Sequence, residues 1–185
     1  MRTLAAHYFI SADGIVDSPQ TWHFPYAGPD VQEVLDVTTA GVDALLLGRH
    51  TYEEWAAFWP QQTGFPLADF INGTPKFVAS NTLMSVDWAG TELLRGDVTE
   101  AVRRLKEQPG GRIAMNGSGT LLRSLLVAGL VDELHLLVHP VVVGTGKHLF
   151  QDGSQTFGLT LESQRTLDGG VLYITYTPAA ATRAA

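Results

Sequence analysis

One stretch of the chain, residues 112–139, constrains the fold more than any other. It holds a short apolar run at 112–115, a turn at 116–119, leucines at helical spacing over 120–128, and a second extended apolar run at 134–139. This order predicts a strand, a helix and a second, parallel strand. The glycine turn then lies at the carboxyl end of the first of the two strands.

That glycine turn has the chemistry of an anion site. Free backbone N–H groups at a helix start point outward, the helix dipole favours negative charge, and glycine lets a phosphate approach the backbone. The turn could equally be a tight connection that binds nothing. It differs from the usual dinucleotide fingerprint, because Leu122 stands at the third glycine position and no acid follows where a ribose would need one. The pattern disfavours a standard Rossmann domain but not a bound pyrophosphate.

Length and composition limit the class of protein. The 185 residues predict one domain over 1–178 and a flexible tail at 179–185. A net charge of −7 argues against a nucleic-acid or acidic-membrane partner, since both need a basic surface. The sequence contains no cysteine, which excludes disulfides and thiolate metal sites and fits a reducing cytoplasm, where we expect the protein. No apolar stretch is long enough to span a bilayer.

Apolar runs and helical patterns alternate along the rest of the chain. Further strands are expected at 3–10, 43–47, 76–79, 91–94, 159–166 and 171–177. Helices are expected from 29 or 30 to 40, at 52–58 and from 97 or 99 to 108, with irregular stretches at 15–29 and 60–74. Together these predict a three-layer α/β fold with a mixed, mostly parallel central sheet, helices on both faces and a C-terminal antiparallel hairpin.

Chemically useful groups follow three of these strands. Asp13 comes just after the first strand, 48–51 follow the second, and 80–81 follow the third. Ligands of open α/β sheets bind outside the carboxyl ends of the strands, so these groups and the glycine turn are predicted to share one site. Arg49 suits forked phosphate contacts, although an arginine after a strand is more often a solvated surface residue. Asp13 could likewise do no more than cap its Asp-Gly turn.

The loop at 15–29 carries several aromatic rings. Its rings, Trp22, His23, Phe24 and Tyr26, could stack on a planar ligand or fold the loop onto the core. His135 and His139 lie on one face of a strand but about 13 Å apart by strand rise, too far to share a metal without other geometry, so no metal site is expected. No serine stands in a nucleophile-elbow pattern.

Several of these motifs, taken in order, resemble the dihydrofolate reductase superfamily. They are the 11–14 segment, the 48–53 segment (Gly-Arg-His-Thr-Tyr-Glu) and the 117–121 turn that opens a helix. The segments 131–134, 139–140 and 144–146 are similar to the reductase domain of the bifunctional riboflavin-pathway deaminase–reductase, the RibD C-terminal type. The resemblance covers nearly the whole chain.

The resemblance implies NADPH as the cofactor and assigns residues to it. The adenosine-side phosphates would contact Gly48, Arg49 and Thr51. The 2′-phosphate would lie near Ser80 and Asn81. The pyrophosphate would be cradled by Gly117, Ser118, Gly119, Thr120 and Leu121. Asp13 would be the catalytic and substrate-binding group beside the nicotinamide, and Trp22 would also bind substrate.

The resemblance further implies a homodimeric NADPH-dependent reductase that transfers hydride to a heterocyclic or related small molecule, like a 5-amino-6-(5-phosphoribosylamino)uracil reductase. Other functions stay open: a non-catalytic nucleotide-binding protein on the same fold, a true dihydrofolate reductase, or a flavin-using reductase. Ala27 stands where dihydrofolate reductases carry their pterin-binding acid. His7 and Asn116 stand where riboflavin-type domains carry a lysine and a glutamate.

Overall fold

The computed structural model describes residues 1–64, 66–150 and 155–179, so most of the predicted tail lies outside the described residues. The strands are β1 (Leu4–Ser11), β2 (Val42–Gly48), β3 (Lys76–Ala79), β4 (Thr91–Leu94), β5 (Arg112–Met115), β6 (Glu133–His139), β7 (Leu159–Thr166) and β8 (Leu172–Pro178). The α-helices are α1 (Pro29–Thr39), α2 (Arg49–Phe58), α3 (Pro66–Gly73), α4 (Val98–Glu107) and α5 (Gly119–Val127). Short 3-10 turns occupy Pro19–Thr21, Phe24–Tyr26, Trp59–Gln61 and Asp168–Gly170.

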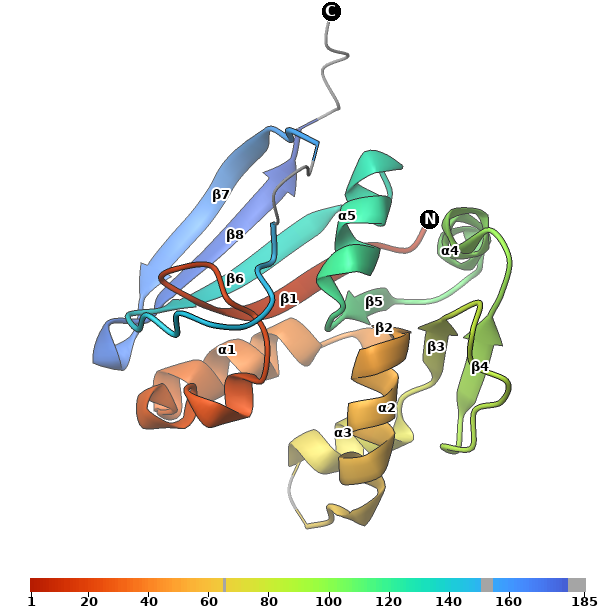
Figure 1. Cartoon of the computed structure of the whole chain (residues 1–185), viewed down its shortest axis with the longest axis horizontal. Coiled ribbons are helices and arrows are strands. Elements are labelled where there is room, and N and C mark those ends of the chain that lie inside the picture. The colour runs from red at the N-terminus through yellow and green to blue at the C-terminus, as the bar shows by residue number, and fades with distance from the viewer. Residues whose placement is uncertain (65, 151–154, 180–185) are drawn as a thin grey trace, which may run out of the picture.

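All eight strands form one sheet in the order β4-β3-β2-β5-β1-β6-β8-β7 (Figure 1). The strands from β4 to β6 in this order are all parallel to one another. β8 is antiparallel to both of its neighbours, β6 and β7. The first strand of the chain therefore lies in the middle of the sheet, between β5 and β6. Because parallel strands end on the same side, the ends of β1, β2, β3, β5 and β6 meet at one edge, here called the carboxyl edge.

Side chains alternate between the two faces of the sheet, and each face packs against its own layer of helices. On one face, Leu4, Ala6 and Tyr8 of β1 join a buried cluster with α4 and α5. On the other face, α1 packs on Leu137 of β6, and a third cluster joins β2 to Ile71 of α3. Figure 1 shows α1, α2 and α3 together on one side of the sheet, with α4 and α5 on the other.

The predicted α/β sheet with helices on both faces and a closing hairpin is confirmed, but two local predictions were wrong. The helix α2 begins at Arg49 rather than Tyr52, because Gly48 is extended and serves as the N-cap residue itself. The stretch predicted as irregular contains α3, which buries Ala68 and Ile71. A helix of eight residues is too short to be stable by propensity, so its burial against the sheet decides its existence.

A buried lysine connects α3 to the sheet. Lys76, the first residue of β3, is 1% exposed, and its Nζ donates to the carbonyls of Asn72 (3.0 Å) and Thr74 (2.8 Å). The same Nζ lies 4.3 Å from the centre of the Trp88 ring. The ammonium thus satisfies carbonyls at the end of α3, where a cation is favoured. Burial lowers the pKa of Lys76 from 10.5 to about 8.

This pKa predicts a pH-dependent stability. Between pH 8 and pH 10.5 the unfolded chain holds a proton at Lys76 that the folded chain has lost, so the contribution of this group to the free energy of unfolding rises with pH. In urea unfolding at about pH 7.5 and about pH 9.5, we expect wild type to gain stability relative to Lys76→Met at the higher pH. The control is Lys147→Met, at a side chain that is 63% exposed. An equal difference at both pH values would contradict this origin.

Candidate functional site

Two turns from distant parts of the sequence touch at the carboxyl edge. The Gly48 N–H donates to the Gly117 carbonyl at 3.4 Å. A Cβ added to Gly117 would lie 2.5 Å from Thr51 Oγ1, and a Cβ added to Gly48 would lie 2.7 Å from Ser118 Oγ. Gly117 also has a φ of +79°, which favours glycine. The turns at 48–51 and 117–119 therefore lie in direct contact, with no room for a side chain at either glycine.

The start of α5 lies at this surface. Ser118 caps the helix, since its Oγ accepts from Leu121 N at 3.3 Å, and its carbonyl accepts from Tyr8 Oη at 3.2 Å. The Gly117–Ser118 peptide is cis. Gly119 and Thr120 follow in the first turn, whose N–H groups have no partner within the helix. The Leu121 side chain is buried in the core, and the contact of the 117–121 turn with a pyrophosphate stays a prediction.

Arg123 lies beside the same turn, although it was not among the predicted site residues. Its Nη1 donates to the Leu149 carbonyl at 2.7 Å, and its Nη2 donates to Thr120 Oγ1 at 3.1 Å. It adds positive charge to the first turn of α5 and ties that turn to the segment that follows β6. The spacing of three residues from Thr120 on a predicted helix was the available signal.

Arg49 lies in the first turn of α2, where the two turns meet. Its side chain is 41% exposed, and its Nη1 is 3.8 Å from Glu53 Oε1. Its Nη2 is 3.2 Å from His50 Nε2. Both contacts come from its own helix, and the side chain is partly exposed, so an anion can reach the guanidinium.

Ser80 and Asn81 reach the same edge, because Ala79 pairs with Gly48. The Ser80 hydroxyl accepts from the N–H groups of Thr82 (3.2 Å) and Leu83 (3.1 Å). The Asn81 amide exchanges two hydrogen bonds, of 2.7 and 3.1 Å, with the Gly96 backbone. Both side chains thus fasten the turn between β3 and β4. Their contact with a 2′-phosphate stays a prediction.

Asp13 holds a loop in place. Its carboxylate accepts from Ser11 Oγ (2.6 Å), Gly144 N (2.8 Å) and Val143 N (3.1 Å). These hydrogen bonds, that of Ser11 first, lower the pKa of Asp13 to about 2. The group is therefore ionised at neutral pH and links the end of β1 to residues 143–144. Its catalytic role stays a prediction.

The rings of the 15–29 loop divide between core and surface. Trp22 is 7% exposed, donates from Nε1 to the Asp17 carbonyl at 3.1 Å, and meets the His139 ring edge-on at 5.2 Å. Phe24 is 67% exposed. The loop thus folds most of its rings onto the sheet, and contact between Trp22 and a substrate stays a prediction.

The acids nearest to Ala27 are already paired. Both oxygens of Glu33 accept from Arg165 of β7, at 2.9 and 3.0 Å. Asp30 lies 3.6 Å from the same arginine and accepts from the Asp168 N–H. Neither Asp30 nor Glu33 is free to replace the acid that is absent at Ala27, and Asp36, the third acid of α1, accepts from Gln32 Nε2 at 2.8 Å.

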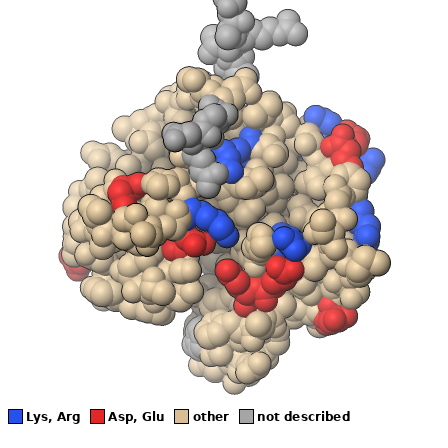
Figure 2. Space-filling model, in the orientation of Figure 1, with Lys and Arg blue, Asp and Glu red and all other residues tan. Residues whose placement is uncertain are grey.

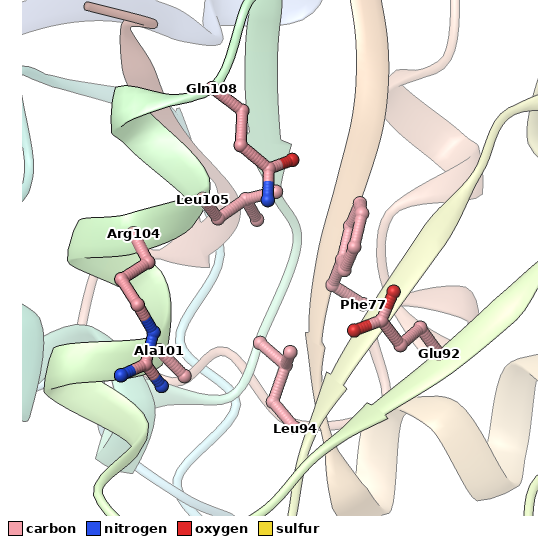
Figure 3. A pocket seen from close by; sticks show the side chains of 7 residues that line it. All are labelled: Phe77, Glu92, Leu94, Ala101, Arg104, Leu105 and Gln108. Carbon is pink, nitrogen blue, oxygen red and sulfur yellow. The ribbon is translucent and has the colours of Figure 1, made fainter.

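A cavity of about 120 Å³ lies elsewhere, between α4 and the strands β3 and β4 (Figure 3). It is lined by Phe77, Glu92, Leu94, Ala101, Arg104, Leu105 and Gln108. None of these is a predicted site residue. Across the described ranges, no three His, Asp or Glu side chains gather as metal ligands. No helix of the described part of the chain is long and apolar enough to cross a membrane.

Fold and edge geometry together define the class as a dihydrofolate reductase-like α/β protein. A putative riboflavin biosynthesis protein from Shewanella sp. PV-4 aligns with a TM-score of 0.79 and 19% identity over 96% of this chain and 99% of its own. Dihydrofolate reductase from Enterococcus faecalis aligns with a TM-score of 0.65 and 15% identity, over 96% and 97%. At these identities the similarity establishes the fold alone.

The chain belongs to the RibD C-terminal domain family, whose sequence model matches residues 2–173. Two Bacillus subtilis (strain 168) relatives are similar to it. "Uncharacterized protein YyaP" is 33% identical over 139 residues, which are 73% of each chain. "Uncharacterized protein YwjB" is 26% identical over 171 residues, which are 91% of this chain and 90% of its own. The family resemblance predicted from the motifs is confirmed.

The close approach of the two turns can be tested by adding one methyl group. Gly117→Ala would combine a positive φ with a clash against Thr51 Oγ1, and we expect it to destabilise the fold by about 3 kcal/mol in urea unfolding. The control, Gly129→Ala, has a φ of +65° but open space, so its cost should be about 1 kcal/mol. Thr51→Ala should recover part of the loss in the double variant. Equal costs at both glycines would mean that the turns do not touch.

Proposed function

We propose that the protein is an NADPH-dependent reductase that transfers hydride to a heterocyclic or related small molecule. The observation that carries the proposal is the contact between the 48–51 and 117–119 turns. Each turn follows a parallel strand and opens a helix, and such positions bind phosphate through backbone N–H groups. Two of them in contact suit a ligand with several phosphates.

The residues at the carboxyl edge fit this cofactor. The lack of side chains at Gly48 and Gly117 leaves backbone open to a pyrophosphate, and α5 begins at the same contact with Ser118 as its N-cap. Arg49 and Arg123 add positive charge to a chain whose net charge is −7. Figure 2 shows blue and red side chains interspersed on one face, so these local cations, rather than a field of one sign, would attract the phosphates. When bound, NADPH supplies the hydride.

Structural neighbours support a nicotinamide cofactor. The Enterococcus faecalis dihydrofolate reductase was solved with NADP(H). A Thermotoga maritima neighbour (TM-score 0.67, 15% identity) is named a diaminohydroxyphosphoribosylaminopyrimidine deaminase/5-amino-6-(5-phosphoribosylamino)uracil reductase, and this chain covers 57% of its length. These activities belong to those proteins. Here they favour a reductase over other uses of the fold.

The acids near Ala27 argue against one kind of reductase. Because Glu33 and Asp30 are paired with Arg165, the two acids nearest to Ala27 are not available to bind the N–H-rich edge of a pterin. This observation argues against a true dihydrofolate reductase. It leaves the nucleotide surface untouched, so a non-catalytic NADPH-binding protein is the second candidate. Turnover on a panel of heterocycles separates the two candidates.

Cofactor binding is the first test. In thermal unfolding with the cofactor near millimolar, we expect NADPH to raise the melting temperature more than NADH does, because only the folded protein binds it. If Arg49 contacts the 2′-phosphate, which NADH lacks, Arg49→Ala should weaken NADPH about tenfold and NADH much less, since a lost phosphate contact costs more than about 1 kcal/mol. Arg104→Ala, at an exposed arginine on α4, is the control. No shift with NADPH would remove the proposal, and equal losses for both cofactors would remove only the role of Arg49.

Asp13 gives a second test once a substrate is found. With a pKa of about 2 its carboxylate is ionised at neutral pH, and its hydrogen bonds hold residues 143–144 against β1. We expect Asp13→Asn to lower kcat while the NADPH dissociation constant stays within about twofold. Steady-state kinetics and cofactor titration measure the two effects. Unchanged turnover would leave Asp13 as a turn former only.

A further inference from the structure

A hydroxyl in the core reaches the glycine turn from the neighbouring strand. Tyr8 of β1 is 7% exposed and belongs to the buried cluster on the face of the sheet that α4 and α5 cover. Its Oη donates to the Ser118 carbonyl at 3.2 Å. Burial raises the pKa of Tyr8, so the hydroxyl keeps its proton at neutral pH and acts as a donor. Nothing in the proposed function uses this hydrogen bond.

The register of the strands places Tyr8 beside this turn. Ala6 of β1 pairs with Met115, the last residue of β5. Tyr8 is two residues farther along β1, and its side chain lies on the same face of the sheet as that of Ala6. Gly117 is likewise two residues beyond Met115. The Tyr8 side chain therefore lies level with the turn that opens α5.

The Ser118 carbonyl does not need this hydroxyl as a partner. It also accepts from the Leu122 N–H at 3.0 Å, in the first hydrogen bond of α5. A phenylalanine in place of Tyr8 would therefore leave no carbonyl without a hydrogen bond, and it would fill the core without the cost of burying a hydroxyl. The hydrogen bond from Tyr8 thus restricts the direction of the carbonyl rather than satisfying it.

The direction of this carbonyl sets the direction of the next N–H. The Ser118–Gly119 peptide is trans, so the Gly119 N–H points away from the Ser118 carbonyl and from Tyr8. The Ser118 hydroxyl accepts from the Leu121 N–H, which leaves the N–H groups of Gly119 and Thr120 without a partner within the helix. The Gly119 N–H is thus available to an anion at the start of α5.

Glycine at position 119 would leave this N–H free to rotate. The peptide groups that flank a glycine turn more freely than those of other residues, so the N–H could swing away from a ligand. The Gly117 carbonyl is held in a similar way, because it accepts from the Gly48 N–H at the end of β2 at 3.4 Å. Hydrogen bonds from two strands, β1 and β2, therefore fix two successive carbonyls of the turn.

We propose that Tyr8 is a positioning residue of the cofactor site, and that its hydroxyl directs the Gly119 N–H toward the pyrophosphate by holding the Ser118 carbonyl. The inference rests on the proposed function, because it needs a nucleotide in the glycine turn. Tyr8 itself does not contact the ligand. The pyrophosphate is common to NADPH and NADH, so Tyr8 affects both nucleotides alike, whereas Arg49 is expected to distinguish them.

A purely structural role is the alternative. In that role Tyr8 fills the core, and its hydroxyl stabilises the fold without any effect on the Gly119 N–H. Loss of the hydroxyl would then lower the free energy of unfolding and leave the nucleotide affinity of the folded protein unchanged. Binding and the Gly119 amide must therefore be measured separately from stability.

The first experiment measures binding by Tyr8→Phe, which removes only the hydroxyl, at a temperature where urea unfolding shows the variant to be folded. We expect the dissociation constants of NADPH and NADH to rise by the same factor, about fivefold, since one hydrogen bond no longer holds the donor. Adenosine 2′-phosphate, which has no pyrophosphate, should bind both proteins equally. The control is Tyr173→Phe, at a hydroxyl that lies 2.8 Å from His135 Nδ1 on the opposite face of the sheet.

The second experiment follows the Gly119 amide by ¹H–¹⁵N NMR. Saturation of the wild type with NADPH should move the Gly119 amide proton downfield, as a hydrogen bond to a phosphate oxygen does. In saturated Tyr8→Phe the shift should be smaller, because the N–H then takes several directions and its hydrogen bond is less linear. In Tyr173→Phe the shift should equal that of the wild type.

The outcomes separate this role from the proposed function. Unchanged nucleotide affinity in Tyr8→Phe, or a Gly119 shift equal to that of the wild type, overturns the role of Tyr8 and leaves the reductase proposal standing. A loss for adenosine 2′-phosphate as large as that for NADPH also overturns it, because the defect would then not lie at the pyrophosphate. Absence of NADPH binding in the wild type overturns both proposals.

Discussion

The close approach of two backbone turns at the carboxyl edge is the constraint on which the site depends. A Cβ added to Gly117 would clash with Thr51 Oγ1, and a Cβ added to Gly48 would clash with Ser118 Oγ. The approach follows from the sheet, because β2 and β5 are parallel neighbours that end side by side. Any side chain at either glycine would push apart two helix starts, α2 and α5. The fold thus brings two phosphate-type turns together through backbone geometry.

Charged side chains form ion pairs at the opposite, amino-terminal ends of the parallel strands. Arg2 pairs with Asp43, Lys106 pairs with Asp132, and Asp132 also accepts from the Leu4 N–H. These partly buried contacts join the start of β1 to β2, α4 and the segment before β6. The loss of one partner would leave a buried charge, so such pairs specify the arrangement more than they stabilise it. At the carboxyl edge, Arg49 is instead 3.8 Å from Glu53, and its side chain is 41% exposed.

Local patterns were enough to predict most of the sheet. The strands at 76–79, 91–94, 112–115 and 159–166 were predicted with the bounds that the structure has, because each is a short apolar or alternating run between turn residues. The helix α3 was missed although Pro66 opens it and Ala68 and Ile71 stand at helical spacing, because a helix of eight residues depends on burial against the sheet rather than on its own propensity. Arg123 was missed for a related reason: its partner, the Leu149 carbonyl, is distant in sequence.

The sequence by itself determined the α/β class, the family and the strand ends that carry the candidate groups, because apolar period and glycine position are local properties of the chain. Only the tertiary structure decided what each polar group does. In the structure, Asp13 holds the loop at 143–144, Ser80 and Asn81 hold a turn, and Glu33 pairs with Arg165. It also paired His23 with His139, 116 residues apart. A hydrogen bond needs two atoms at about 3 Å, and for distant residues that proximity is set by the packing of the whole sheet.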